Sequence, residues 1–582
     1  MHRTHTCGEL RGQDAGKRAE LAGWLSSVRD KGAIMFFTLR DHYGVTQAVT
    51  EDEEIKSQIR EISRESVIQV SGEIVLRTDP NPGMDTGEIE IKPETIKVLG
   101  RCSEVLPFEV AASAGIREDL RLKYRFLDLR NPKVKANIEL RSKVIGAIRA
   151  KMTDLGFMEI QTPILTSSSP EGARDYIVPS RVHPGQFYAL PQAPQQFKQL
   201  LMLSGFDKYF QIAPCFRDED ARADRAPGEF YQLDVEMAFA EQEDVFSAME
   251  PLMHEIFTKF SSSEVTKPPF PRIKYKDSMR LYGTDKPDLR IPLQIADLTE
   301  AFTQSGFPAL AGKSVQALCV PSGSTAPRKL FDRLTEELKG EGAKGLIWLK
   351  AAEGTLSGSA AKFLSPEESQ EIFAKTGAKA GDAIFIIADE RQAALKLTGI
   401  LRNKLGTEFN LIQPNSYKFC WIVDFPMFEL DEDQKLAFSH NPFSMPQGGL
   451  EALRTKDPLD VEAYQYDIVV NGVELSSGAV RNHSPELMLE AFKMAGYSQE
   501  VVETKFAALF NAFKFGAPPH AGIAPGIDRI VMLLANAASI REVIAFPMNK
   551  NAQDLLMNAP GTVTQKQLDE VHIAIKPVEE KK

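Results

Sequence analysis

Two segments of alternating apolar and polar residues stand on either side of a densely charged stretch. The segments read KYFQIAPCFR (208–217) and FYQLDVEMAF (230–239), and the stretch between them, DEDARADRAPGE, carries both signs of charge. A period of two is typical of β-strands, so the pattern predicts an antiparallel pair joined by a charged loop. The second strand then has one apolar face and one polar face, and the polar face carries Gln232, Asp234 and Glu236.

A polar strand face in the middle of a folded chain needs partners. Burying an unpaired polar or charged group is unfavourable, so such a face is either neutralised by a structural network of salt bridges or lines a ligand cavity. The alternation alone fits both interpretations. Residues elsewhere in the sequence are needed to choose between them.

Composition limits the class of protein. A chain of 582 residues, 43% hydrophobic and 26% charged, is expected to form about three or four globular domains. The N-terminus lacks the basic-then-apolar order of a secretory signal, and no run of about 18 apolar residues could span a membrane. The five cysteines lie far apart without a CxxC pair, which argues against a zinc site or a disulfide framework. We therefore expect a soluble, cytoplasmic protein with no membrane partner.

Residues 1–107 read as short alternating strands separated by turn signals, with one helical segment. This pattern predicts a five-stranded barrel of the OB type, a fold that often binds oligonucleotides. The net charge of −11 argues against a general positive field for nucleic acid, but it leaves local RNA contacts open. Arg29, Phe36 and Arg40 could supply stacking and phosphate contacts, although one of the adjacent residues Phe36 and Phe37 could equally belong to the barrel core.

The rest of the chain divides into segments of different composition and periodicity. A charged connector occupies 108–130, and 131–289 begins with a helix of apolar periodicity that Gly156 is placed to cap. Residues 290–415 are rich in Ala, Gly and Lys and interrupt the catalytic-looking sequence, so we interpret them as an inserted α/β domain. Strand-like sequence returns in 416–582, and the whole is predicted to be an α+β protein.

Carboxylates and arginines far apart in the sequence indicate a nucleotide site. Asp467 and Glu474 precede Arg481, and Arg529 stands at the start of an amphipathic helix after several glycines and prolines. Two carboxylates with several arginines suit a magnesium triphosphate, because Mg²⁺ prefers oxygen ligands and guanidinium groups pair with phosphate. No GxxxxGK[ST] occurs, nor a GxGxxG after a strand, nor the HIGH and KMSKS signatures of class I synthetases. The nucleotide site must therefore be of another kind.

These residues resemble a known family. FRDED, RADR and QLDVE resemble motif 2 of the class II aminoacyl-tRNA synthetases, GIDRIVMLL resembles motif 3, and the helix ending in GFMEIQTPIL resembles motif 1. PEGARDY, FYALPQAPQQFKQLLM, NGVELSSGAVR and APPHAGIAPGIDR are similar to the bacterial-type aspartyl-tRNA synthetases of class IIb. The resemblance covers nearly the whole chain. It implies a class II catalytic domain whose mainly antiparallel sheet is flanked by helices, and an anticodon-binding barrel.

The resemblance also implies roles for single residues. The catalytic residues would be Arg217, Glu219 and Arg529. ATP would be bound by these three together with Phe230, Glu474, Gly526, Ile527 and Asp528, and Mg²⁺ by Asp467 and Glu474. L-Aspartate would be bound by Glu171, Gln195, Lys198, Arg217, Gln232, Asp234, His440 and Arg481. The anticodon would be read by Arg29, Phe36 and Gln47, and Lys31 stands where members that discriminate between tRNA-Asp and tRNA-Asn differ from those that do not.

The implied activity is that of an aspartate-tRNA ligase acting as a homodimer, with ATP and Mg²⁺. Two alternatives are weighed against it. An asparaginyl- or lysyl-tRNA synthetase would share the barrel and motifs but would lack the combination of Arg481 and Lys198. A nucleic-acid-binding descendant without catalysis would have no use for Arg217, Glu474 and Arg529 together. The sequence leaves open whether tRNA-Asn is charged in addition to tRNA-Asp.

Overall fold

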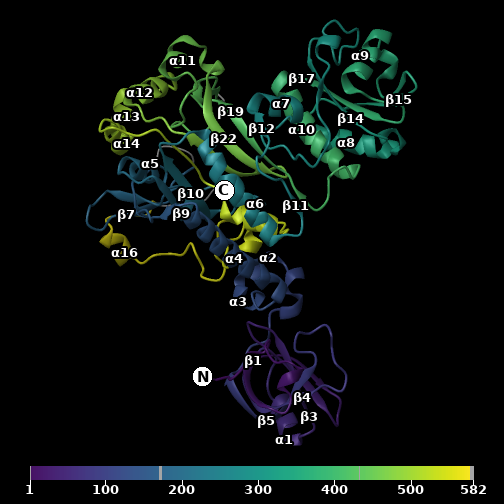
Figure 1. Cartoon of the computed structure of the whole chain (residues 1–582), viewed down its shortest axis with the longest axis vertical. Coiled ribbons are helices and arrows are strands. Elements are labelled where there is room, and N and C mark those ends of the chain that lie inside the picture. The colour runs from purple at the N-terminus through teal and green to yellow at the C-terminus, as the bar shows by residue number, and fades with distance from the viewer. Residues whose placement is uncertain (1, 169–172, 432, 577–582) are drawn as a thin grey trace. The chain divides into compact units, whose positions relative to one another are not determined.

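The computed structural model describes residues 2–168, 173–431 and 433–576, and the chain forms two compact units, Met1–Glu109 and Val110–Lys582. The first unit holds a closed five-stranded barrel, and the second holds an eight-stranded sheet and a separate five-stranded sheet (Figure 1). Among the described residues, no helix is both long and apolar enough to cross a membrane.

The barrel closes around side chains that alternate along its strands. Its strands pair in the order β1-β2-β3-β5-β4, and their inward residues, such as Leu21, Ile68 and Ile91, form one buried core. Phe37 is buried in this core, whereas Phe36 is only partly buried. The prediction of an OB-type barrel with one core phenylalanine is therefore confirmed. The elements are β1 (Arg18–Asp30), β2 (Met35–Arg40), β3 (Val45–Thr50), α1 (Glu53–Arg60), β4 (Val67–Leu76) and β5 (Ile89–Gly100).

The main sheet of the second unit joins segments that are distant in the sequence. Its order is β12-β19-β22-β23-β24-β10-β9-β6, and all pairs are antiparallel except the two outermost, β12 with β19 and β6 with β9. The predicted mainly antiparallel sheet is thus confirmed. The strands are β6 (Met158–Glu159), β9 (Lys208–Arg217), β10 (Gly228–Ala238), β12 (Arg272–Lys274), β19 (Phe419–Pro426), β22 (Glu462–Val470), β23 (Val473–Val480) and β24 (His520–Ile523).

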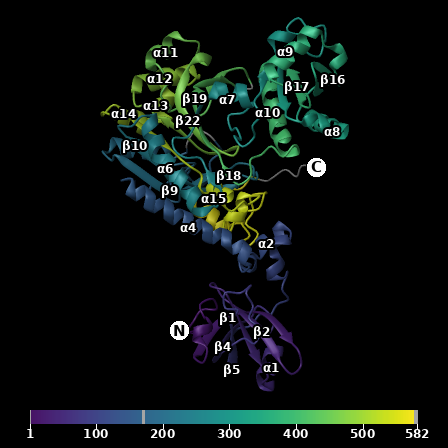
Figure 2. The same ribbon diagram turned by 45° about the vertical axis from the view of Figure 1, so that its right-hand side comes forward.

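Strand β10 has the two faces that its alternation predicts. Leu233 and Val235 are buried in the main core, where they pack with helices α4 (Pro132–Asp154), α6 (Gln242–Phe260) and α15 (Ile527–Leu534). Figure 2 shows these helices beside β9 and β10. Because neighbouring side chains of a strand point to opposite faces, Asp234 and Glu236 lie on the face away from these helices. Gly156 lies two residues after the end of α4 and has a positive φ of 81°, the conformation expected of a capping glycine.

The five-stranded sheet lies within residues 296–389. Its order is β13-β14-β17-β15-β16, and every pair is antiparallel, so the label α/β holds only in the loose sense of mixed helices and strands. Helices α8 and α10 share a core with Leu318 and Phe385, while α9 packs in a second core with Ala317 and Ile384. The elements are β13 (Ala296–Asp297), β14 (Ser314–Val320), α8 (Arg328–Gly340), β15 (Ile347–Ala352), β16 (Thr355–Gly358), α9 (Pro366–Thr376), β17 (Ala383–Asp389) and α10 (Arg391–Glu408).

Shorter elements complete the second unit. The predicted charged connector folds into α2 (Glu118–Lys123) and α3 (Arg125–Asp128), and the C-terminal segment carries α16 (Gln565–Glu570). The remaining helices are α5 (Gln195–Leu203), α7 (Tyr275–Tyr282), α11 (Gly449–Thr455), α12 (Pro485–Met494), α13 (Gln499–Lys505) and α14 (Ala507–Phe513). Three small ribbons pair β7 (Ile177–Pro179) with β8 (Phe187–Ala189), β11 (Glu264–Val265) with β18 (Ser416–Tyr417), and β20 (Phe428–Leu430) with β21 (Leu436–Phe438).

The contact between β10 and β24 requires a glycine. Gly522 pairs with Glu236, and a Cβ at Gly522 would lie 1.9 Å from Glu236 Oε2 and 2.3 Å from the carbonyl oxygen of Val235. We predict that Gly522→Ala lowers the free energy of unfolding by about 1–3 kcal/mol, because the added methyl has no room in a packed sheet. Urea unfolding measures this change. The control is Gly345→Ala, where a Cβ meets open space, and equal stability of the two variants would contradict the prediction.

Candidate active site

A cavity of about 360 Å³ in the second unit lies where β9, β10, β23 and the start of α15 meet. It brings together side chains from across more than 300 positions of the sequence. Eleven of the residues singled out from the sequence line it: Gln195, Lys198, Arg217, Glu219, Phe230, Gln232, Asp234, Glu474, Gly526, Asp528 and Arg529.

The polar face of β10 is neutralised by two buried cations. Asp234 Oδ1 accepts a hydrogen bond of 2.6 Å from Lys198 Nζ, and Glu236 accepts two from Arg481, at 2.9 Å from Nε and 3.2 Å from Nη2. All four side chains are at most 2% exposed. The face is therefore a compact network of two acids and two bases, with Lys198 Nζ also 3.4 Å from Glu236 Oε2.

Two polar atoms of this network have no hydrogen-bond partner in the described part of the chain. They are Asp234 Oδ2, an acceptor, and Arg481 Nη1, a donor. Burial raises the pKa of Asp234 above its ordinary value, even though Lys198 opposes this. Burial acts in the same direction on Glu236, but Arg481 and then Lys198 bring its pKa below the ordinary value. The network thus offers an unused acceptor and an unused donor, a combination that suits a charged polar ligand.

Arg481 does not line the cavity and is linked to it through Glu236. It follows β23 directly, its backbone N–H donates to the His520 carbonyl at 2.8 Å, and its guanidinium contacts Glu236 rather than the cavity lining. Gly522 lies beside the same carboxylate. The pairing of β10 with β24 therefore fixes the position of Arg481 through Glu236.

The charged loop and the end of β9 form the second part of the cavity. The guanidinium of Arg217 lies 5.0 Å from the centroid of the Phe230 ring, and its buried Nε has no hydrogen-bond partner among the described residues. Glu219 forms an ion pair with Arg225 across the loop. An arginine beside a partly buried aromatic ring and an acid suits a planar base next to a phosphate.

The start of α15 supplies one structural residue and one cation. Asp528 Oδ2 accepts from the backbone N–H of Tyr231 at 2.8 Å, and Oδ1 is paired with Arg141 of α4, so this carboxylate joins three elements. Arg529 donates from Nη1 to the carbonyl oxygen of Glu474 at 2.7 Å and lies 3.3 Å from Asp224. Ile527, expected at the nucleotide, is instead fully buried in the main core.

Asp467 and Glu474 form an acidic pair on neighbouring strands β22 and β23. Asp467 is 1% exposed, and neither of its carboxylate oxygens has a hydrogen-bond partner among the residues that the structure describes. Burial, followed by the charge of Glu474, raises its pKa well above the ordinary value. Burial has the same effect on Glu474, but Lys286 and then Arg529 bring the pKa of Glu474 below its ordinary value.

The acidic pair has the donor atoms that Mg²⁺ prefers. Within the described ranges, no group of three or more His, Cys, Asp or Glu side chains is arranged to hold a metal. Mg²⁺ is commonly bound by one or two carboxylates together with substrate phosphates, so two carboxylates beside a cavity lined by arginines fit this ion. The unpartnered oxygens of Asp467 support that fit.

Four of the described residues singled out from the sequence for this site do not line the cavity, namely Asp467, Arg481, Ile527 and His440. Glu171 lies outside the described residues. His440 is exposed, packs edge-on against Phe425 and is absent from the cavity lining, where its neighbour Asn441 appears instead. Lys286 also lines the cavity and was missed, because it lies in a turn-rich segment, YGTDKPD, that matches no motif considered.

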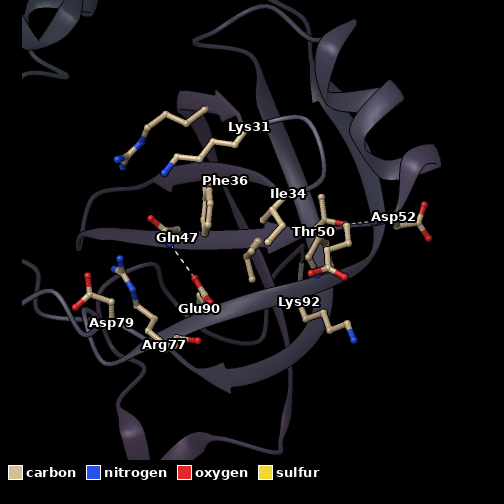
Figure 3. A pocket seen from close by; sticks show the side chains of 15 residues that line it. Lys31, Ile34, Phe36, Gln47, Thr50, Asp52, Arg77, Asp79, Glu90 and Lys92 are labelled. Carbon is tan, nitrogen blue, oxygen red and sulfur yellow. Dashed lines mark hydrogen bonds between the residues drawn. The ribbon is translucent and has the colours of Figure 1, made fainter.

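The barrel has a cavity of its own, of about 790 Å³ (Figure 3). The four residues given tRNA-reading roles by the resemblance, Arg29, Lys31, Phe36 and Gln47, line it. Arg40, also singled out from the sequence, does not, and it pairs with Glu65 at 2.7 Å. Lys31 Nζ lies 5.9 Å from the centroid of the Phe36 ring. An aromatic ring among cations suits a stacked base beside a phosphate.

Six further charged residues of the barrel cavity were missed from the sequence: Glu51, Asp52, Arg77, Asp79, Glu90 and Lys92. Arg77, Glu90 and Lys92 come from the end of β4 and from β5. Gln47 donates from Nε2 to Glu90 Oε2 at 2.8 Å, as Figure 3 shows. These strands come together only when the barrel closes, so no local sequence pattern predicts that these residues share a cavity.

Comparisons with known proteins agree with this architecture. Residues 117–550 match the family described as tRNA synthetases class II (D, K and N), and residues 19–99 match an OB-fold nucleic acid binding domain. The chain is 55% identical over 580 residues to an aspartate-tRNA ligase of Streptomyces avermitilis, with 99% of each chain covered. It is 53% identical over 590 residues to an aspartate-tRNA(Asp/Asn) ligase of Zymomonas mobilis, again with 99% of each covered.

Solved structures show the same fold at lower identity. An asparaginyl-tRNA synthetase from Pyrococcus horikoshii, complexed with asparaginyl-adenylate, aligns with a TM-score of 0.59 at 19% identity, covering 94% of this chain and 98% of that one. An aspartyl-tRNA synthetase from Entamoeba histolytica aligns with a TM-score of 0.57 at 21% identity, covering 93% and 90%. The family match and the full-length relatives establish that the chain belongs to the class II tRNA synthetases of the D, K and N group.

Proposed function

We propose that this class II synthetase is an aspartate-tRNA ligase. It activates L-aspartate with ATP to aspartyl-adenylate, releasing pyrophosphate, and transfers the aspartyl group to the 3′ end of tRNA-Asp. Full-length relatives with this name support the proposal. Homodimer formation, a cytoplasmic location and the use of ATP and Mg²⁺ belong to the same proposal, on the grounds of family membership.

The observation that carries the proposal is the buried network on β10. An L-aspartate molecule has a negative side chain and a positive ammonium group, and the network has an unused donor at Arg481 Nη1 and an unused acceptor at Asp234 Oδ2. In this proposal Arg481 and Lys198 select the side-chain carboxylate, and Asp234 with Gln232 binds the ammonium group. Gln195, Arg217, His440 and Glu171 are the further proposed contacts of the amino acid.

An uncharged side chain would fit this pocket poorly. Asparagine has the size of aspartate, but its neutral amide would give the unused donor of the buried Arg481 no charged acceptor. Leaving a buried charged group unpaired costs about 1–3 kcal/mol or more, and a site built around polar groups rejects an analogue that lacks the matching group. The same argument disfavours asparaginyl- and lysyl-tRNA synthetase as the function of this chain.

The nucleotide would occupy the other end of the cavity. Arg217 is proposed to bind the α-phosphate, Phe230 and Glu219 the adenine, and Arg529 the γ-phosphate, with the backbone at Gly526, Ile527 and Asp528 beside the ribose and phosphates. Asp467 and Glu474 would hold Mg²⁺, which supplies charge neutralisation at the phosphate oxygens when bound. The carboxylate of Asp528 contributes by fixing α15 against β10 rather than by direct contact.

The chemistry proposed for this site needs no protein nucleophile. An oxygen of the α-carboxylate of aspartate attacks the α-phosphorus, the bond to the bridging oxygen of the β-phosphate breaks, and pyrophosphate leaves with the electron pair. The chain aligns the two reactants and stabilises the charge on the phosphate oxygens through Arg217 and Arg529. The terminal hydroxyl of the tRNA then attacks the acyl carbon, and AMP leaves.

The barrel is proposed to read the anticodon. Phe36 would stack on a base, with Arg29 and Gln47 contacting the same nucleotides and Lys31 influencing the choice between tRNA-Asp and tRNA-Asn. Relatives of similar identity include both aspartate-tRNA ligases and aspartate-tRNA(Asp/Asn) ligases. A charging assay with purified tRNA-Asp and tRNA-Asn decides between the two specificities.

The role of Arg217 is tested by its removal. Arg217→Ala should lower aspartate-dependent exchange of pyrophosphate into ATP by at least about 10²-fold, because one preorganised donor to a developing charge is worth that much. Binding of tRNA, measured by filter retention, should stay within about twofold because the barrel is unchanged. Exchange at the wild-type rate would contradict the assigned role.

The role of the barrel is tested at Phe36. We expect Phe36→Ala to weaken charging of tRNA-Asp by about tenfold or more, since stacking on one base contributes about 1–3 kcal/mol. Pyrophosphate exchange without tRNA should be unchanged. The matched control is Tyr43→Ala, an exposed aromatic of the barrel outside the cavity. Equal losses of charging and exchange in Phe36→Ala would show that the barrel does not act as a separate reader.

A further inference from the structure

Lys286 is a cation of the catalytic cavity that none of the sequence motifs includes. Its Nζ lies 2.7 Å from Glu474 Oε2, and its side chain lines the cavity together with Arg217 and Arg529. It belongs to the segment between α7 and the five-stranded sheet, about 190 positions before its partner. This contact joins that segment directly to the acidic pair.

The two cations near Glu474 are held differently. Arg529 is fixed by the Glu474 carbonyl oxygen and by Asp224, and its guanidinium is 3.9 Å from the Glu474 carboxylate. In the described part of the chain, the ion pairs of Lys286 involve only Glu474 and Asp285, the latter at 3.9 Å. Lys286 can therefore leave Glu474 without breaking other ion pairs, whereas Arg529 cannot move without losing its backbone contact.

The environment of Asp467 explains why a cation that can move away from Glu474 is useful. Its buried carboxylate has no hydrogen-bond partner among the described residues, so the acidic pair is balanced chiefly at Glu474. A buried carboxylate and a partly buried neighbour without a counter-charge would repel each other. A lysine at Glu474 reduces that repulsion as long as no metal is present.

We propose that Lys286 is a positioning residue that holds Glu474 in the metal-free enzyme and is displaced from it by the divalent cation. This rests on the proposed function, in which Asp467 and Glu474 are the metal ligands. The Lys286 ammonium, 2.7 Å from Glu474 Oε2, would compete with the metal for the Glu474 carboxylate. Lys286 thereby keeps the site assembled and sets the metal concentration at which it fills.

The last helix of residues 290–415 fixes the segment that carries Lys286. Gly283 ends α7 with a φ of 68°, and a Cβ there would lie 2.2 Å from the carbonyl oxygen of Leu395 in α10. On the other side of Lys286, the buried Arg402 of α10 donates to the carbonyl oxygens of Asp288 at 2.9 Å and Leu293 at 2.7 Å. Helix α10 therefore anchors this segment both before and after Lys286.

Binding of Mn²⁺ alone tests the competition, because Mn²⁺ takes the same oxygen ligands as Mg²⁺ and its free form is seen by electron paramagnetic resonance. We expect Lys286→Met to lower the Mn²⁺ concentration for half-saturation by about threefold to tenfold, the range of a partly buried ion pair. Lys286→Arg should stay close to wild type because it keeps the charge. The matched control, Lys276→Met, removes an exposed lysine of α7 that lies 3.6 Å from Glu462, and it should change nothing.

Steady-state exchange supplies a second readout. Lys286→Met should shift the Mg²⁺ dependence of exchange in the same direction and leave the KM for aspartate within about twofold, because the ion pairs of Lys286 among the described residues involve Glu474 and Asp285 and not the β10 network. Gly399→Ala, whose Cβ would lie 2.6 Å from the Gly283 carbonyl oxygen, should shift Mn²⁺ binding in the wild type but not in the Lys286→Met background.

Different results would contradict the competition at Glu474 and the proposed function. Unchanged or weaker Mn²⁺ binding in Lys286→Met would overturn the competition at Glu474, even if the wild-type protein catalyses aspartate-dependent exchange. Wild-type protein without such exchange would overturn the proposed function. An additive shift in the Gly399→Ala, Lys286→Met double variant would show that α10 does not act through Lys286.

Discussion

Two buried carboxylates on one strand, each held by a cation from another element, are the interaction on which this structure depends. Asp234 and Glu236 of β10 would be strongly unfavourable alone, and Lys198 of α5 and Arg481 after β23 offset that cost. The compensation works only if β24 lies beside β10 with a glycine at 522. The strand order of the main sheet therefore also determines which charged side chains meet at the cavity.

The local sequence pattern predicts the two faces of single strands, but it does not predict which residues far apart in the sequence meet in the fold. Alternation in 230–239 indicates both faces of β10, and the adjacent phenylalanines at 36 and 37 divide between cavity and core as one interpretation had it. The pairing of Glu236 with Arg481 could not be predicted, because 245 positions separate them and only the strand order brings them together. The same holds for Asp528, whose carboxylate braces α4 and β10, and for Lys286, whose position depends on α10.

The cavity of the second unit has two chemically different ends. At the β10 end, full burial makes each unpaired atom costly, which favours a ligand of matching charge. At the other end, Arg529 stands beside Glu474, and these two groups already have protein partners that a ligand must replace or share, whereas Arg217 Nε and the carboxylate of Asp467 have no hydrogen-bond partner among the described residues. Selectivity then arises at the first end, and the alignment of phosphates at the second.

Exchange of pyrophosphate into ATP with L-aspartate or L-asparagine as the sole amino acid tests the central claim most directly. Because the unused donor of the buried Arg481 is matched best by a carboxylate, kcat/KM for exchange should be at least about 10²-fold higher with aspartate than with asparagine. Comparable values for the two amino acids, or a preference for asparagine, would contradict the account of the β10 network as the selective element.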